Sequence, residues 1–396
     1  MVFILEKEKK KKQLNFSVEF WRFFFTISIA GYHVGTTFAR GRGLDTSVWF
    51  FGASEILTVF LIFSGFFIMS SFRKRKESGV DADLPPRTQA WNYLKEKLKQ
   101  LMPIFIIGQL LGFFATCLLL KYPLTDWPML FVNSIWEFTG LSISGLGMGS
   151  QSSGLFYSGT VGTVTGTMGH FMWNQPLWYI SGLLISSYVI YYLLAKNEDR
   201  FLGFTAPVLY VVISAYWYIN GFRAAFAATT FGGYFNSGLI FMFITISLGC
   251  LVYLLVDKHK DKKFSGAGKF GLTLLSVAVA ATLVVFTLRS DLLNLDRYTL
   301  HALSMILATL ALLNKDYLSK LLNLKVFGYL GRLSIYIFVV HYPITYFVYT
   351  IYAFENVYHL MIVVFIFAIL FAILLKLIVE EVINPLLFPK KKSIKS

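Results

Sequence analysis

The stretch HLMIVVFIFAILFAILLKLIVE, residues 359–380, decides the class of fold. Between Leu360 and Leu375 it contains no charged side chain. An α-helix rises about 1.5 Å per residue, so about 20 apolar residues cross the hydrocarbon core of a bilayer. A segment of this length and composition predicts a transmembrane helix rather than a buried helix of a soluble domain.

Similar apolar runs recur along the whole chain of 396 residues. Charged residues make up only 14% of the chain, against about 25% in soluble domains. We expect ten membrane spans, at 18–38, 48–70, 101–120, 175–195, 202–220, 236–256, 269–288, 298–313, 326–348 and 359–380. The sequence therefore predicts an all-α fold, a polytopic transmembrane helix bundle of about ten spans.

Lys and Arg are distributed unevenly between the segments that connect these runs. When alternate segments are assigned to opposite sides of the membrane, one side carries 28 Lys and Arg and the other side carries six. Cytoplasmic loops carry such an excess, so both termini are expected in the cytoplasm. The net charge of +15 is then accounted for by topology and contact with membrane lipids, and no nucleic-acid partner is expected.

The connecting segments also indicate how the chain is divided. We expect a basic cytoplasmic tail at 1–17, a single transmembrane domain at 18–388 and a second basic tail at 389–396. The longest external loop covers about 121–173, has no Lys or Arg after Lys121, and has nine glycines from Gly140 to Gly169. Glycine at this density favours irregular backbone, and part of the loop, around 129–143, could re-enter the membrane.

Two ionisable residues stand out in the first span, in the stretch WRFFFTISIAGYH at 21–33. Arg22 and His33 are eleven residues apart, which places them on one face of a helix and about 16 Å apart along its axis. Ionisable residues inside a membrane are costly and usually mark a pathway or a site. Glu55, in the second span, is expected at the depth of His33, where a carboxylate would orient the imidazole if the two helices are neighbours. The alternative is a buried His and Glu that only hydrogen-bond within the bundle.

The spacing of Arg22 and His33 resembles the signature of the acyltransferase-3 family of integral-membrane O-acyltransferases. Three further stretches resemble motifs of that family in the same order: FLIFSGFFI at 60–68, NQPLWYISGLL at 174–184 and LGRLSIYIFVVHYPI at 330–344. The second of these is similar to the branch that modifies exopolysaccharides. The resemblance extends from about residue 20 to residue 345.

The resemblance implies an enzyme that transfers an acyl group across the membrane. The donor would be cytoplasmic acyl-CoA, by default acetyl-CoA, and the acceptor a hydroxyl of an envelope or secreted glycan or of a lipid-linked saccharide. The protein would then be a multi-pass protein of a bacterial plasma membrane. No metal is expected, and Cys117 and Cys250 fall inside predicted spans as small apolar side chains.

The residue types, their expected depths and the resemblance together give candidates for individual roles. The catalytic candidates are His33 and Glu55, the acyl-CoA-binding candidates are Arg22, Lys97 and Arg332, and the other site candidates are Ser64, Trp178, Tyr336 and His341. His33 would act as general base on the acceptor hydroxyl or would carry the acyl group covalently. The three basic residues, near the cytoplasmic side, could bind CoA phosphates. His301 is instead expected to lie at the membrane interface.

The sequence departs from the family pattern in three stretches, and a second function is open. Lys97 and Gln100 stand where the family often has two arginines, Thr58 stands where an acid is common, and no acid follows Trp178. The alternative function is a transporter or flippase whose charged residues line a path, but the internal repeats typical of transporters are not found in the sequence. A non-catalytic scaffold gives no reason for Arg22 and His33 to share a face.

Overall fold

A computed structural model describes residues 15–44, 50–133, 135–140, 148–149, 153–154, 173–219, 230–231, 235–293 and 295–388. The long helices are α1 (Phe16–Gly41), α2 (Leu57–Glu77), α3 (Pro86–Leu119), α6 (Trp178–Lys196), α8 (Ala206–Ile219), α9 (Ser237–His259), α10 (Gly266–Leu288), α11 (Arg297–Leu313), α13 (Lys325–Ile351) and α14 (Val357–Leu377).

Short elements connect these helices. The helical ones are η1 (Phe51–Ser54), η2 (Leu124–Asp126), α4 (Trp127–Asn133), η3 (Ile135–Thr139), η4 (Gln175–Leu177), α7 (Glu198–Arg200), η5 (Phe201–Thr205), α12 (Tyr317–Leu321), η6 (Ile378–Ile383) and α15 (Asn384–Leu387). Two antiparallel pairs of very short strands complete the described chain, β1 (Met148–Gly149) with β2 (Ser153–Gly154) and β3 (Thr230–Phe231) with β4 (Phe235–Asn236).

Each predicted apolar run overlaps one of the long helices, so the predicted all-α helix bundle is confirmed. Over the described residues, eight helices are long and apolar enough to cross a membrane. Helix α11 is a shorter apolar helix, and α1, which carries Glu19, Arg22 and Arg40, is not among the eight. The number of about ten spans therefore stays a prediction.

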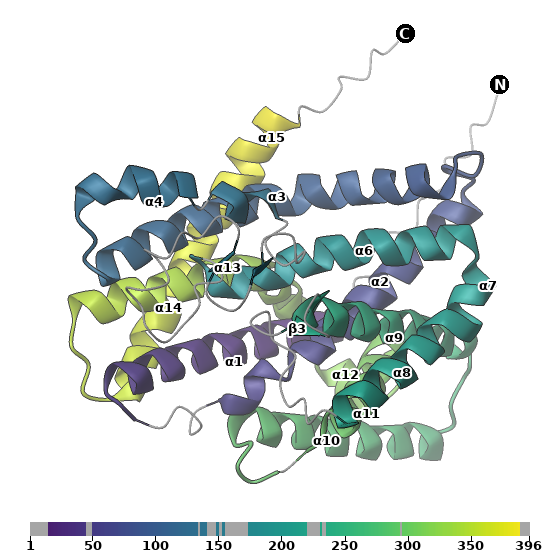
Figure 1. Ribbon diagram of the computed structural model, residues 1–396. Helices are drawn as coiled ribbons and strands as arrows, with labels where there is room; N and C mark the ends of the chain where they lie inside the picture. Colours follow the sequence, from purple (N-terminus) through teal and green to yellow (C-terminus); the bar gives the residue numbers. More distant parts are fainter. Residues whose placement is uncertain are drawn as a thin grey trace, which may run out of the picture.

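Contacts between helix ends show which of these ends lie together. Asn15 Nδ2, before α1, donates to the carbonyl of Ala311 at the end of α11, at 2.7 Å. Lys76, near the end of α2, forms an ion pair of 2.9 Å with Glu198, which follows α6, and both helices end on the right of Figure 1. The side chain of Arg42, after α1, donates to the carbonyl of Phe354, after α13, so these two helices end together.

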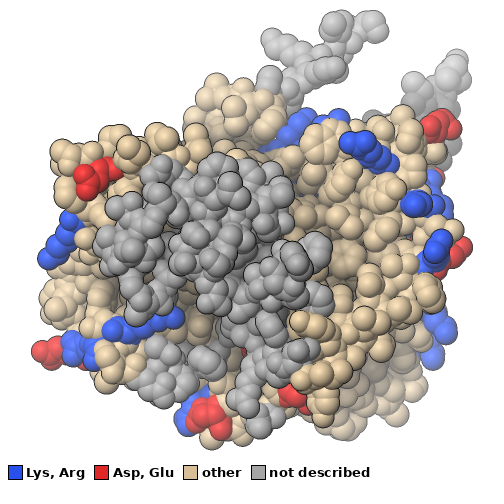
Figure 2. All heavy atoms as spheres, viewed as in Figure 1, with Lys and Arg blue, Asp and Glu red and all other residues tan. Residues whose placement is uncertain are grey.

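The basic connections gather on the side of the bundle where α2 and α6 end. The α2–α3 connection and the α6–α7 junction lie on the right of Figure 1, whereas the α13–α14 turn lies on the left. Figure 2 shows a band of Lys and Arg side chains along the same right-hand margin. This arrangement agrees with the charge asymmetry of the sequence, and we refer to this side as the basic end.

The site is positioned by two close helix pairs, α1 with α13 and α2 with α9. At the second pair, Gly65 and Gly249 bring the two backbones into contact. A Cβ on Gly65 would lie 1.9 Å from the carbonyl oxygen of Ile246, and one on Gly249 would lie 2.1 Å from that of Ile62. Small residues allow such close approach of membrane helices, and this contact fixes the face of α2 that carries Ser64.

Candidate active site

A cavity of about 330 Å³ lies between α1, α2, α3, α6 and α13. Its polar lining comes from Arg22, Thr26, Ser64, Lys97, Tyr179 and Ser334. The rest of its lining is aliphatic or aromatic. We call it the donor cavity, because it combines two cations with an apolar wall in the way that an anionic, partly apolar ligand requires.

Arg22 and Lys97, two of the three basic residues expected to bind the donor, both line this cavity. Arg22 Nη1 forms an ion pair of 3.0 Å with Glu19 Oε2, one turn earlier in α1, and its side chain keeps 32% of its exposure. The Lys97 ammonium lies 5.5 Å from the centre of the Tyr93 ring. The third predicted cation, Arg332, is exposed and is not part of the cavity lining.

Hydroxyl groups form the polar part of the cavity wall. Ser64 Oγ donates to the carbonyl of Phe60 at 2.8 Å and lies 3.4 Å from the Tyr179 hydroxyl. Ser64 therefore lines this cavity. Tyr179 was missed in the sequence, although it follows Trp178 directly within a quoted motif. Trp178 itself is half-buried at the first position of α6 and does not line the cavity.

Beyond the cavity along α1, His33 meets a second histidine. Its ring centre lies 5.3 Å from that of His341 and 5.3 Å from that of Tyr342, both on α13. His341 is fully buried, and its Nδ1 lies 3.2 Å from the carbonyl of Ile337. Its Nε2 is buried without a hydrogen-bond partner among the described residues. The packing of α1 on α13 therefore places the two imidazoles side by side and leaves His341 Nε2 without a hydrogen-bond partner among the described residues.

One aromatic ring contacts both the cavity and the imidazole pair. Phe338 lines the donor cavity. Its ring centre lies 5.8 Å from that of His341 and 5.7 Å from that of Tyr179. The cavity and the histidines are therefore neighbouring regions of one site, with an apolar side chain between them.

The structure places Glu55 with a different partner from the one expected. Glu55 lies in the turn before α2 and forms an ion pair of 3.6 Å with Arg297, the first residue of α11. No hydrogen bond between Glu55 and His33 is found within the described residues. One turn further along α11, His301 is buried rather than exposed, with its ring nitrogens 3.1 Å from the Tyr210 hydroxyl and 3.3 Å from the Thr245 hydroxyl.

A polar chain runs from an exposed glutamine to the ring that contacts His33. The hydroxyl of Tyr342 donates to Gln175 Oε1 at 3.1 Å and shares a hydrogen bond with the hydroxyl of Tyr346. Gln175 is exposed and lies in η4, directly before α6.

Two buried polar residues that the sequence did not single out hold the chain that flanks residues 141–172. The Glu137 carboxylate accepts a hydrogen bond of 2.7 Å from the Trp173 amide, and its burial raises the pKa of Glu137 well above its ordinary value. Asn174 Nδ2 donates to the carbonyls of Gly108 at 2.9 Å and Val339 at 2.8 Å. These bonds tie the loop to α3 and α13 beside the imidazole pair.

Tyr336, the remaining candidate, lies away from both regions. It is buried, and its hydroxyl donates to Glu380 Oε1 in η6 at 3.1 Å. Glu380 also forms an ion pair of 3.0 Å with Lys376. Tyr336 therefore joins α13 to the end of α14. Within the described part of the chain, no group of three or more His, Cys, Asp or Glu side chains is placed to hold a metal ion.

These features define a class of protein, a multi-pass membrane bundle with a cation-lined cavity next to a pair of imidazoles, one of them fully buried. A family model described as an acyltransferase domain, that of the acyltransferase-3 family, matches residues 15–380. The chain therefore belongs to the acyltransferase-3 family and is a membrane acyltransferase. No curated protein and no solved structure matches it.

Proposed function

We propose that this protein transfers an acyl group, by default acetyl, from acyl-CoA at the basic, cytoplasmic end to a hydroxyl of an envelope or secreted glycan or a lipid-linked saccharide. One observation carries the proposal. A cation-lined cavity, an imidazole pair and an outward polar chain follow one another along α1 and α13. The membrane would be a bacterial plasma membrane.

The donor cavity supports the choice of acyl-CoA. Arg22 and Lys97 supply two cations to one cavity, and charge-assisted hydrogen bonds to phosphate are among the strong polar contacts of proteins. The ion pair with Glu19 holds the Arg22 guanidinium in place. The aromatic wall suits the uncharged arm of the donor, and the hydroxyls of Ser64 and Tyr179 suit its amide and thioester oxygens.

His33 is the group best placed for the chemical step. The acceptor hydroxyl would lose its proton to the His33 imidazole as its oxygen attacks the thioester carbonyl. The carbon–sulfur bond then breaks, and the CoA thiolate leaves and takes up a proton. In the covalent alternative, the imidazole first accepts the acyl group and then passes it to the hydroxyl. His341, beside His33, would orient the ring in either case.

The acceptor would approach from the outer end. Gln175 and Tyr342 connect the surface to the ring of His33, and both can hydrogen-bond to sugar hydroxyls. The external loop, with its many Gly, Ser and Thr and few charges, suits a neutral glycan. The similarity of NQPLW at 174–178 to the exopolysaccharide branch of the family supports the same class of acceptor.

Glycan analysis tests the proposal directly. Envelope and secreted glycans from cells with and without the protein would be compared for base-labile acetate, and the protein in proteoliposomes would be supplied with labelled acetyl-CoA. We expect acetate on the glycan only in the presence of the protein. Movement of a glycan across the membrane without acylation would instead support the transporter alternative.

A further inference from the structure

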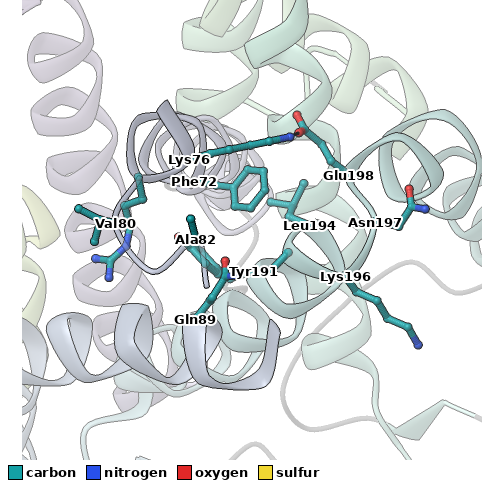
Figure 3. A pocket seen from close by; sticks show the side chains of 12 residues that line it. Phe72, Lys76, Val80, Ala82, Gln89, Tyr191, Leu194, Lys196, Asn197 and Glu198 are labelled. Atoms are coloured by element: carbon teal, nitrogen blue, oxygen red, sulfur yellow. Dashed lines mark hydrogen bonds and ion pairs between the residues drawn. The ribbon is translucent and has the colours of Figure 1, made fainter. Parts of the chain in front are cut away.

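A second cavity, of about 410 Å³, opens at the basic end and is not part of the site described above. It lies between the end of α2, the α2–α3 connection, the start of α3 and the α6–α7 junction (Figure 3). Phe72, Tyr191 and Leu194 give it an apolar floor. Its volume falls within the range of small-molecule sites, about 300–1,000 Å³.

The rim of this cavity is polar and rich in cations. Arg75, Lys76 and Lys196 line it, together with the acid Glu198. Glu198 is buried and paired with both Arg73, at 2.5 Å, and Lys76, at 2.9 Å, and Figure 3 shows Lys76 reaching across to it. Because two cations compensate this carboxylate, it need not repel an anion and can accept hydrogen bonds from ligand hydroxyl or amino groups.

A pair of stacked rings separates this cavity from the donor cavity. Tyr191, on the floor of the second cavity, stacks on Tyr93 with ring centres 4.5 Å apart. The Lys97 ammonium, which lines the donor cavity, lies 5.5 Å from the other tyrosine, Tyr93. Along α3, Gln89 of the second cavity and Lys97 are eight residues apart, which corresponds to about 12 Å.

We propose that the second cavity binds the 3′-phosphoadenosine end of the acyl-CoA donor, while the acyl end occupies the donor cavity. This inference rests on the proposed function. The flat base requires an apolar surface with hydrogen-bonding groups at its edge, and the floor and the rim amides of Gln89 and Asn197 supply these. The phosphates require cations: Lys196 supplies one at the same rim, and Lys76, which is already paired with Glu198, lines the rim beside it. The distance of about 12 Å along α3 between Gln89 and Lys97 is within the length of one extended donor molecule.

Two variants test this inference independently of the proposed function. Ala82→Trp fills the cavity from an exposed position on its rim, and Lys196→Glu reverses a rim charge. Lys258→Glu, exposed at the end of α9 and outside the cavity lining, is the matched control. Coenzyme A affinity of the purified protein is measured by calorimetry, with adenosine 3′,5′-bisphosphate as competitor. Transfer is measured with acetyl-CoA and with acetyl-pantetheine, which lacks the nucleotide.

We expect both variants to weaken coenzyme A binding about tenfold or more, the control to bind normally, and the bisphosphate to compete on the unaltered protein. Transfer from acetyl-pantetheine should stay within about twofold, since this donor makes no contact in the second cavity. Unchanged coenzyme A affinity in both variants overturns the inference, and so does equal loss of transfer from both donors. If the unaltered protein transfers acetyl from neither donor, the proposed function fails as well.

Discussion

The two ionisable side chains of α1 lie in contrasting surroundings. Arg22 lines a cavity, is paired with Glu19 and remains 32% exposed. His33 contacts the rings of His341 and Tyr342, and His341 is fully buried. The charged side chain thus keeps exposed surface and a counter-ion, whereas the imidazole lies against other rings. In the proposed function this contrast corresponds to donor binding and chemistry at separate places, about 16 Å apart on one helix.

If this division is correct, replacing His33 should have the largest effect. We expect His33→Ala to lower the turnover number by about 10²–10⁴-fold, because a positioned acid or base contributes that much to proton transfer. Coenzyme A affinity should stay near that of the unaltered protein. Turnover in proteoliposomes and calorimetric binding measure the two quantities. Normal glycan acylation by a well-expressed variant would remove His33 from the mechanism.

Replacing Arg22 should produce the opposite pattern. Arg22→Lys keeps the charge but loses the planar fork of donors. Loss of one charge-assisted contact costs about 1.5–3 kcal/mol, so coenzyme A affinity should fall roughly ten- to a hundredfold while turnover persists at saturating donor.

Arg332→Lys is the matched control for Arg22→Lys. Arg332 is exposed and outside the lining of the donor cavity, so the same substitution there should leave coenzyme A affinity unchanged. Equal weakening by both substitutions would show that the donor is held differently from our proposal and would restore Arg332 as a donor-binding residue.

Breaking the polar chain between Tyr342 and Gln175 should affect acceptor binding alone. Tyr342→Phe keeps the ring against His33 but loses the hydroxyl that donates to Gln175. A neutral hydrogen bond contributes about 1 kcal/mol, so the KM for the acceptor should rise about fivefold. The rate of acyl-CoA hydrolysis without acceptor should not change. A matching fall in that hydrolysis would mean that Tyr342 only supports the position of His33.

Replacing Glu55 should have the smallest effect, and it distinguishes a structural role of this residue from a catalytic one. Its ion pair with Arg297 is partly exposed, and such pairs contribute up to about 1 kcal/mol to stability. Glu55→Gln should therefore lower the melting temperature of the detergent-purified protein by a few degrees and change turnover less than His33→Ala does. A fall in turnover as large as that of His33→Ala, with an unchanged melting temperature, would return Glu55 to a catalytic role.

The sequence by itself determined the helices and which ionisable residues share a helix face. Runs of about 20 apolar residues admit few structures other than membrane helices, because the backbone must satisfy its own hydrogen bonds in lipid. The periodicity of one helix placed Arg22 and His33 on one face. Charge asymmetry and the resemblance placed Arg22, Lys97 and Arg332 near the cytoplasmic side as donor-binding candidates; the first two line one cavity, and Arg332 does not.

Only the tertiary structure decided which helix faces meet. The partner of Glu55 is Arg297, His33 lies beside His341, and His301 is buried. These contacts depend on how side chains of distant helices fit together, because lipid surrounds every helix with an equally apolar environment and gives no hydrophobic preference for one neighbour. Close approach at Gly65 and Gly249 is one such fit, and hydropathy along a single chain does not encode it.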